Sequence, residues 1–333
     1  MGVMTFDPKT VLVYVGGDLV GDAVMKLPFV QALRHTWPNA HITWYAGKFR
    51  SAFAHELSPL VVGLIDEVIE DTGLGRSIFK LFRRPLAERF FDLIIDTQRG
   101  GGTTFLVRRI RHKTFISGTA NFLFSSIKPP TTYRRPNSMI VQLLDLLTLA
   151  AGHPAVPHSK LTISADDKSA AKQALPDGKN YVGLAPGAGG KHKCWPLEHF
   201  IALANRQIEM GRCPVFILGP EEGDLYKLLR QREVRALFPT VRGATKPNPS
   251  VTFSIALAQR LSIAVANDSG TGHILAAADI PLVSLFGPTP AEKFAPTTNK
   301  LEIIRAKEFG AEEMAAIPVE SVVAAMNRLI TAN

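Results

Sequence analysis

The stretch VLVYVGGDLVGDA (residues 11–23) introduces the pattern that decides the fold: an apolar run, a glycine turn and then a helix. The run before the turn has the length and the branched side chains of a buried strand. The helix predicted over 23–37 places Leu27, Val30 and Leu33 on one apolar stripe. Repetition of this unit along the chain predicts an α/β protein with parallel strands.

The first half of the chain repeats the alternation of strands and helices up to a proline-punctuated segment. Further strands are expected at 41–46, 66–70, 91–96 and 114–118, and a closing helix at 137–152. Strands that are regularly interrupted by helices form a doubly wound parallel sheet. The segment 153–167 is expected to be a linker.

The pattern restarts at NYVGLAPG (180–187), again a strand that runs into a glycine-rich turn. Strands are expected at 214–220, 261–268 and 281–288, and helices at 199–210, 224–238, 272–279 and 318–330. The sequence thus predicts two Rossmann-like, doubly wound domains, residues 1–160 and 161–333. Ligands of open parallel sheets bind beyond the carboxyl ends of the strands, so we expect the domains to face each other across a cleft.

The net charge and the residue composition limit the kinds of binding partner that we expect. The 333 residues carry a formal net charge of +9, which fits a phosphorylated ligand, an acidic membrane surface or nucleic acid. Nucleic acid is disfavoured because no recognisable binding module is present and the basic residues are dispersed. Cys194 and Cys213 have no metal-binding spacing. The chain has no signal peptide and no apolar run of about 18 residues, so we expect a cytoplasmic protein.

The opening loop resembles a phosphate-binding loop in its glycines but not in its charges. Gly16 and Gly21 have the spacing of such a loop, yet Asp22 stands in place of its lysine and Ala23 follows. Asp18 adds a second negative charge. Phosphate binding is therefore disfavoured here. On spacing alone, Asp22 either caps the following helix or serves as an acid in the chemistry.

Two loops of the second half have the features of anion sites. APGAGGKHKCWP (185–196) offers glycine N–H groups, Lys191 and Lys193 ahead of a helix, which favours a diphosphate site over a solvated basic loop. NDSGTGHILAAAD (267–279) has a turn of small residues that suits a phosphate equally well. For that turn, simple capping of the helix by Asp268 or Ser269 is an alternative of similar weight.

Taken together, GDAVMKLP, PGAGGKHKCWP and DSGTGH followed by LFGPT resemble glycosyltransferase family 9, in order from about residue 11 to about 290. Its best-known members are the ADP-heptose:lipopolysaccharide heptosyltransferases. The resemblance implies a GT-B architecture, with the acceptor on the first domain and the nucleotide-sugar donor on the second. In this architecture the last helix often packs back toward the first domain. The resemblance also implies an inverting reaction without a metal or another cofactor.

The resemblance assigns roles to individual residues. It makes Asp22 the general base and Lys193 the cation at the donor diphosphate, both as catalytic residues. It implies donor binding by Gly187, Ala188, Gly189, Lys193, Glu222, Asp268, Ser269, Gly270, Thr271, Gly272 and His273. Glu221 competes with Glu222 for the ribose, and Lys191 has no counterpart in the family. Many heptosyltransferases read DTGLSH where this chain reads DSGTGH, which leaves the donor open.

The acceptor side is marked by basic residues in the first half. The segments 108–113 and 131–138 are basic, and Arg99 follows an expected strand. We predict Gly21, Arg99, Arg134 and Arg135 as acceptor-binding residues, for phosphates on a glycolipid or oligosaccharide. A solvated basic surface and contact with an anionic membrane are the alternatives. The apolar segment 77–91, with its interleaved cations, is expected to be a core helix rather than a membrane-surface helix.

The chemistry of glycosyl transfer agrees with these roles. The acceptor hydroxyl must lose a proton while the anomeric carbon gains positive charge, and an aspartate can take that proton. Lys193 and helix N-terminal N–H groups can offset the charge on the leaving diphosphate without a divalent metal.

We therefore expect an inverting, metal-independent glycosyltransferase that moves heptose from ADP-heptose onto a lipopolysaccharide core or a related phosphorylated glycan. One alternative is another nucleotide-sugar enzyme on the same fold, with a different donor or an epimerase activity. A second alternative is a nucleotide-binding protein without catalysis. We expect the enzyme in the cytoplasm, with peripheral contact to the inner membrane as a further alternative.

Overall fold

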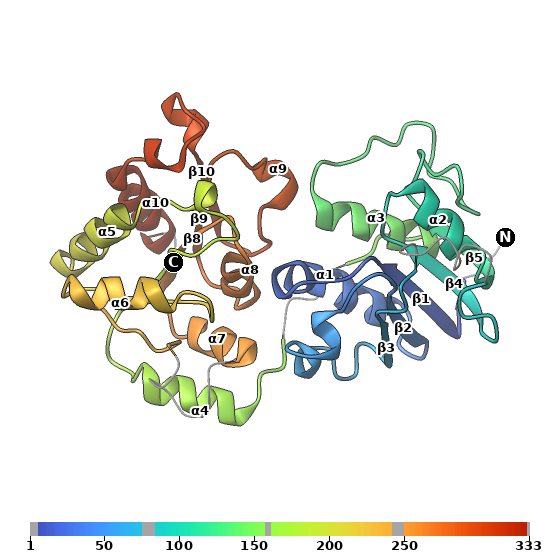
Figure 1. Cartoon of the computed structure of the whole chain (residues 1–333), viewed down its shortest axis with the longest axis horizontal. Coiled ribbons are helices and arrows are strands. Elements are labelled where there is room, and N and C mark those ends of the chain that lie inside the picture. The colour runs from blue at the N-terminus through green and yellow to red at the C-terminus, as the bar shows by residue number, and fades with distance from the viewer. Residues whose placement is uncertain (1–5, 75–83, 157–160, 242–249, 332–333) are drawn as a thin grey trace. The chain divides into compact units, whose positions relative to one another are not determined.

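The computed structural model describes residues 6–74, 84–156, 161–241 and 250–331. The chain divides into two compact units, residues 1–160 and 161–333. Each unit is built on a five-stranded, wholly parallel sheet with helices on both faces (Figure 1). The predicted α/β fold with doubly wound sheets is confirmed.

The first unit has the strand order of a Rossmann-type half, β3-β2-β1-β4-β5. Its strands are β1 Thr10–Val15, β2 His41–Ala46, β3 Glu67–Glu70, β4 Phe90–Asp96 and β5 Arg111–Ser117. Its helices are α1 Val20–Thr36, α2 Gly101–Arg108 and α3 Met139–Ala151, with short 3₁₀ turns η1 Ala52–Ala54 and η2 Ser58–Leu60. The order of the strands reverses between β1 and β4, so the loops after these two strands flank the position where such folds bind ligands.

Helix α1 is more apolar than a surface helix because it is buried on more than one of its faces. Leu27, Val30 and Leu33 form the predicted buried stripe, but neighbours such as Phe29 and Lys26 are buried as well. The helix packs against α3 on one side of the sheet, and α2 joins the core cluster on the other side. The helix begins at Val20 rather than at residue 23, which brings Asp22 into its first turn.

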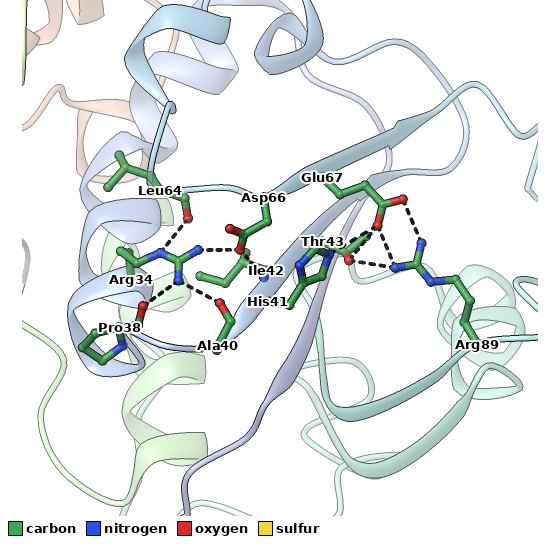
Figure 2. Close-up of polar contacts among 10 residues, drawn as sticks. All are labelled: Arg34, Pro38, Ala40, His41, Ile42, Thr43, Leu64, Asp66, Glu67 and Arg89. Carbon is green, nitrogen blue, oxygen red and sulfur yellow. Dashed lines mark hydrogen bonds and ion pairs between the residues drawn. The ribbon is translucent and has the colours of Figure 1, made fainter.

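Two arginines, Arg34 and Arg89, bind carboxylates and backbone carbonyls near the amino ends of β2 and β3 (Figure 2). Arg34, in the last turn of α1, donates to Asp66 Oδ2 at 2.6 Å and to three backbone carbonyls. The carbonyls are those of Leu64, Pro38 and Ala40, at 3.2, 3.0 and 2.7 Å. Arg89 binds Glu67 through two parallel hydrogen bonds of 2.9 and 2.7 Å. These contacts stabilise the sheet at the edge away from the loops that follow its strands.

The second unit has the order β10-β9-β8-β6-β7. Its strands are β6 Tyr181–Ala185, β7 Cys213–Phe216, β8 Ile263–Asn267, β9 Leu282–Phe286 and β10 Leu301–Arg305. Its helices are α4 Ala165–Ala174, α5 Leu197–Glu209, α6 Gly223–Gln231, α7 Val251–Ala258, α8 Gly270–Ala277, α9 Ala291–Phe294 and α10 Val319–Thr331. The 3₁₀ turns are η4 Lys191–Lys193, η5 Ala306–Phe309 and η6 Met314–Ala316. The terminal helix α10 packs on α5 and on strands β8 to β10 of its own unit (Figure 1).

The helix predicted over 224–238 is wrong beyond Gln231. The helix α6 ends there, Glu233 adopts a left-handed φ of 52°, and Leu237 forms a parallel bridge beside β7. The Leu237 N–H donates to Pro214 at 3.0 Å, and its carbonyl accepts from Phe216 at 2.8 Å. Pairing at the sheet edge thus overrides the helical periodicity of the segment.

Two further predictions need correction. The predicted linker 153–167 overlaps α4, which begins at Ala165 and is capped by Ser164. Residues 157–160 and 77–83 lie outside the described residues. The described part of the segment 77–91 is residues 84–91. It is a turn that leads into β4 rather than a helix, and Phe91 packs in the core as part of that strand. None of the helices in the described ranges has both the length and the apolar composition needed to cross a bilayer.

Candidate active site

The two aspartates of the opening loop occupy opposite environments. The side chain of Asp18 is fully buried and forms an ion pair with Lys26. Its Oδ2 also accepts from Trp44 Nε1 at 2.9 Å and from Ser51 Oγ at 3.1 Å. The backbone of Asp18 forms a parallel bridge with Ser51. Asp18 therefore joins the loop after β1 to β2 and to the segment that follows it, and its carboxylate is fully engaged.

Asp22 is exposed in the first turn of α1, next to the half-buried Gly21. Its carboxylate makes no hydrogen bond or ion pair with any residue that the structure describes. Leu19 is the N-cap residue of the helix, and no side chain caps it. The capping interpretation of Asp22 thus has no hydrogen bond to support it. Of the two acids, Asp22 is the one whose oxygens are open to a ligand.

A shallow hollow lies beyond the carboxyl ends of β4 and β5. Arg99 and Arg135, both predicted acceptor-binding residues, are among the side chains that line it. Arg134 is not among them; it is exposed and donates to the carbonyls of Thr131 and Tyr133. The structure therefore brings together two of the three predicted arginines.

In the second unit, Lys193 and Asp268 meet although they are 75 positions apart in sequence. Lys193 lies on η4, in the glycine-rich loop after β6, and Asp268 directly follows β8. Lys193 Nζ lies 2.8 Å from Asp268 Oδ2, and the two side chains are 30% and 9% exposed. The ion pair places a partly accessible cation at the carboxyl edge of this sheet.

Asn267 fixes both ends of the glycine-rich loop. It is fully buried as the last residue of β8. Its Nδ2 donates to the Pro186 carbonyl at 2.7 Å, and its Oδ1 accepts from the Trp195 backbone N–H at 3.1 Å. Sequence reasoning did not assign Asn267 to the site, although an amide at the end of an otherwise apolar strand was the signal that could have found it.

Glu222 lies directly against the start of the same loop. A Cβ added at Gly187 would stand 1.4 Å from Glu222 Oε1, so Gly187 leaves room for this carboxylate. Glu222 accepts from the Gly219 N–H at 3.0 Å. Burial, opposed by this bond and reinforced by Glu221, raises the pKa of Glu222. Glu221 itself is exposed. Of the two glutamates, Glu222 is therefore the one that is positioned beside the loop.

The remainder of the loop is more accessible. Ala188 is half-buried, and Gly189 and Lys191 are exposed. The structure gives Lys191 no ion pair with a described residue.

The turn after β8 becomes the N-terminus of α8. Ser269 is its N-cap residue, and its hydroxyl accepts from the Gly272 N–H at 3.1 Å, so the capping interpretation is correct for this serine. The N–H groups of Gly270 and Thr271 lie in the first turn, where helices have no internal acceptor for them. His273 is half-buried in the next turn of the same helix.

The predicted site residues thus fall into two groups, one on each unit. Gly21, Asp22, Arg99 and Arg135 lie in the first unit, and the Lys193, Glu222 and Asp268 group lies in the second. Within the described ranges, no group of three or more His, Cys, Asp or Glu side chains could hold a metal ion.

Comparison with solved structures supports the architecture. A glycosyl transferase family 9 protein from Veillonella parvula superimposes with a TM-score of 0.74 at 20% identity, over 99% of both chains. The E. coli heptosyltransferase WaaC with ADP superimposes with a TM-score of 0.69 at 18% identity, over 96% of this chain and 99% of that one. The predicted GT-B fold class is confirmed by this likeness.

Sequence comparison gives the same assignment. Lipooligosaccharide heptosyltransferase 2 of Haemophilus influenzae is 25% identical over 319 residues, which cover 88% of each chain. The model of glycosyltransferase family 9 (heptosyltransferase) matches residues 78–317, well over half of the chain. The protein is a glycosyltransferase, and it belongs to glycosyltransferase family 9.

Proposed function

We propose that this enzyme transfers heptose from ADP-heptose to a lipopolysaccharide core acceptor, with inversion at the anomeric carbon and without a metal. The relatives that support the proposal are named as heptosyltransferases of lipopolysaccharide or lipooligosaccharide, and solved structures of similar fold hold ADP or an ADP-heptose analogue. The observation that carries it is the Lys193–Asp268 pair beside the N-terminus of α8, because this arrangement suits a diphosphate.

On the donor side, the diphosphate gains negative charge as its bond to the sugar breaks. Lys193 and the first N–H groups of α8 offset that charge electrostatically. The two hydrogen bonds of Asn267, to Pro186 and Trp195, hold the glycine-rich loop in place, so little reorganisation is needed at the moment of reaction. Glu222 is the proposed acceptor for the ribose hydroxyls.

On the acceptor side, Asp22 is the proposed general base. The acceptor hydroxyl gives its proton to an Asp22 oxygen as its own oxygen bonds to the anomeric carbon. The bond from that carbon to the diphosphate breaks on the opposite face, and ADP leaves with the electron pair. Such a base contributes about 10²–10⁴-fold to the rate.

Substitution of Asp22 tests the mechanism. Asp22→Asn is expected to lower kcat by about 10²–10⁴-fold, because the amide cannot accept the proton. Binding of ADP, measured by titration calorimetry, should stay at the wild-type level. The matched control is Asp166→Asn, which changes another exposed carboxylate in a first helical turn, again one without a partner among the described residues. If Asp22→Asn and Asp166→Asn turn over at the same rate, Asp22 is not the base.

Thermal shifts with nucleotides test the donor. A ligand at 100 times its Kd stabilises the folded chain by about 2.7 kcal/mol. We expect ADP and ADP-heptose to raise the melting temperature more than UDP, GDP or their sugars. A preference for UDP would exclude ADP-heptose as the donor, and donor turnover without any acceptor would favour an epimerase.

A further inference from the structure

The turn after β4 meets the loop after β1 at the carboxyl edge of the first sheet. Thr97 donates twice to the Tyr14 carbonyl, through its N–H at 3.1 Å and through its hydroxyl at 2.8 Å. The carboxamide of Gln98 lies beside Gly16, since a Cβ added at Gly16 would stand 3.3 Å from Gln98 Oε1. Because the strand order reverses between β1 and β4, this contact lies where such folds bind ligands.

Buried side chains hold the backbone of Gln98 on both sides. Its N–H donates to Asp96 Oδ1 at 2.9 Å, and its carbonyl accepts from the Thr119 hydroxyl at 3.1 Å. Thr104 and Ser117, both fully buried, donate to Asp96 Oδ2 at 2.6 and 3.0 Å. The position of Gln98 is therefore set by the fold and needs no ligand.

The carboxamide of Gln98, in contrast, keeps most of its hydrogen-bonding capacity. Among the described residues, its Nε2 donates to the Thr97 hydroxyl at a long 3.4 Å, and its Oε1 accepts no hydrogen bond. One N–H donor and both acceptor lone pairs thus stay available. No described backbone group depends on this carboxamide, so a purely structural role does not explain its placement.

The chemistry of this side chain indicates a neutral, hydroxylated ligand. A carboxamide donates and accepts at the same time, and a sugar hydroxyl does the same. The loop that Gln98 contacts begins at Gly16 and leads into the first turn of α1, where Asp22 lies. A sugar whose reacting hydroxyl faces Asp22 is therefore bound at the edge of the sheet that also carries Gln98.

We propose that Gln98 binds a second hydroxyl of the acceptor sugar, one that does not react, and thereby determines which acceptors the enzyme uses. The inference rests on the proposed function, which places the reacting hydroxyl at Asp22. Gln98 takes no part in proton transfer. It orients the acceptor, and Gly16 leaves the space that the carboxamide occupies.

Acceptors that lack single hydroxyls test this role. Transfer is measured with O-deacylated lipopolysaccharide core and with analogues that each lack one hydroxyl of the terminal sugar. For at least one analogue, we expect the wild type to lose about tenfold in kcat/KM, because the carboxamide is left without its partner. Gln98→Ala should lose a similar factor with the complete acceptor and should no longer distinguish it from that analogue. The donor KM and the melting temperature should stay unchanged.

Gln142→Ala is the matched control. Gln142 is another half-buried glutamine of the first unit, but its Nε2 already donates to the carbonyls of Pro136 and Asn137 at 2.6 and 3.2 Å. This variant should keep the wild-type preference among the acceptors. If Gln98→Ala discriminates against every analogue as strongly as the wild type does, or if the control loses the preference equally, the inference is wrong.

Binding without transfer separates this inference from the proposed function. The side-chain amide signal of Gln98 in a proton–nitrogen correlation spectrum is assigned by its absence in Gln98→Met. We expect the complete acceptor, added without donor, to shift this signal. A shift without any transfer of heptose would refute the proposed donor alone. Shifts elsewhere in the first unit, with the Gln98 signal unmoved, would refute the inference and leave the proposed function intact. An acceptor that does not bind at all would refute both.

Discussion

The buried ion pair of Asp18 and Lys26 allows a quantitative prediction. Asp18→Ala leaves the Lys26 ammonium with a side chain only 9% exposed, and it removes the acceptor of Trp44 Nε1. Removing one partner of a buried pair costs about 3–5 kcal/mol. A stranded buried N–H costs about 1–3 kcal/mol. Because one carboxylate serves both groups, the two costs overlap, and we expect a total of about 4 kcal/mol.

Urea unfolding measures this loss, and hydrogen–deuterium exchange of peptides from β1, β2 and α1 assigns it to the first unit. The melting temperature should fall by about 8–16 °C, at about 2–4 °C per kcal/mol for a unit of this size. Asp22→Ala is the control on the same loop. The Asp22 carboxylate is exposed and has no partner in the described ranges, so its removal should change the free energy of unfolding by less than about 0.5 kcal/mol.

A double variant separates the charge from the loss of packing. Asp18→Leu with Lys26→Met replaces the pair by apolar side chains and should recover most of the stability. If Asp18→Ala costs less than about 1 kcal/mol but abolishes turnover, the reasoning fails, and Asp18 rather than Asp22 is the general base.

Three more predictions concern the amino edge of the first sheet, Asp96 at the end of β4, and the glycine-rich loop. Arg34→Ala removes four hydrogen bonds at the amino edge and should cost about 2–4 kcal/mol in urea unfolding; kcat should stay unchanged, and a changed kcat would contradict the structural role. Burial raises the pKa of Asp96 from 3.8 to about 6, so its contribution is present at low pH and is lost as the pH rises through 6. Relative to Asp96→Asn, the wild type should therefore gain about 1.4 kcal/mol of unfolding free energy between pH 7.5 and pH 5, and parallel pH curves would refute the shift. Gly187→Ala places a methyl group against Glu222 and should weaken ADP binding about tenfold in calorimetry, whereas Gly102→Ala, in the first unit and with open space around it, should leave it unchanged.

The fold could be predicted because its signals are local. Each central strand is an apolar run bounded by glycine or a polar residue, and the two halves repeat the same order of elements. The end of α6 could not be predicted in this way. Residues 224–238 keep a helical pattern to their end, but Leu237 gains backbone hydrogen bonds beside β7 that only the folded sheet offers.

The site was predictable only where a loop carries its own chemistry. The glycine-rich loop and the turn after β8 contain features that point to a diphosphate, but the choice of Lys193 and Asp268 within them rested on the family resemblance. The difference between Asp18 and Asp22 depends on Trp44 and Ser51, which are distant in sequence. Sequence reasoning preferred Asp22 through a family resemblance, whereas the structure supplies the physical reason that Asp18 is unavailable.

The Lys193–Asp268 ion pair has a consequence for competition among anions. Because the Asp268 carboxylate already neutralises Lys193, chloride or another monovalent ion gains little by binding there. A diphosphate can replace that carboxylate and also reach the N–H groups of α8, which one small ion cannot do at once. Under the proposed function, the Asp268 carboxylate therefore competes with free anions for Lys193. That internal anion would keep the site from filling with the ordinary salts of its surroundings and leave it to multivalent nucleotides.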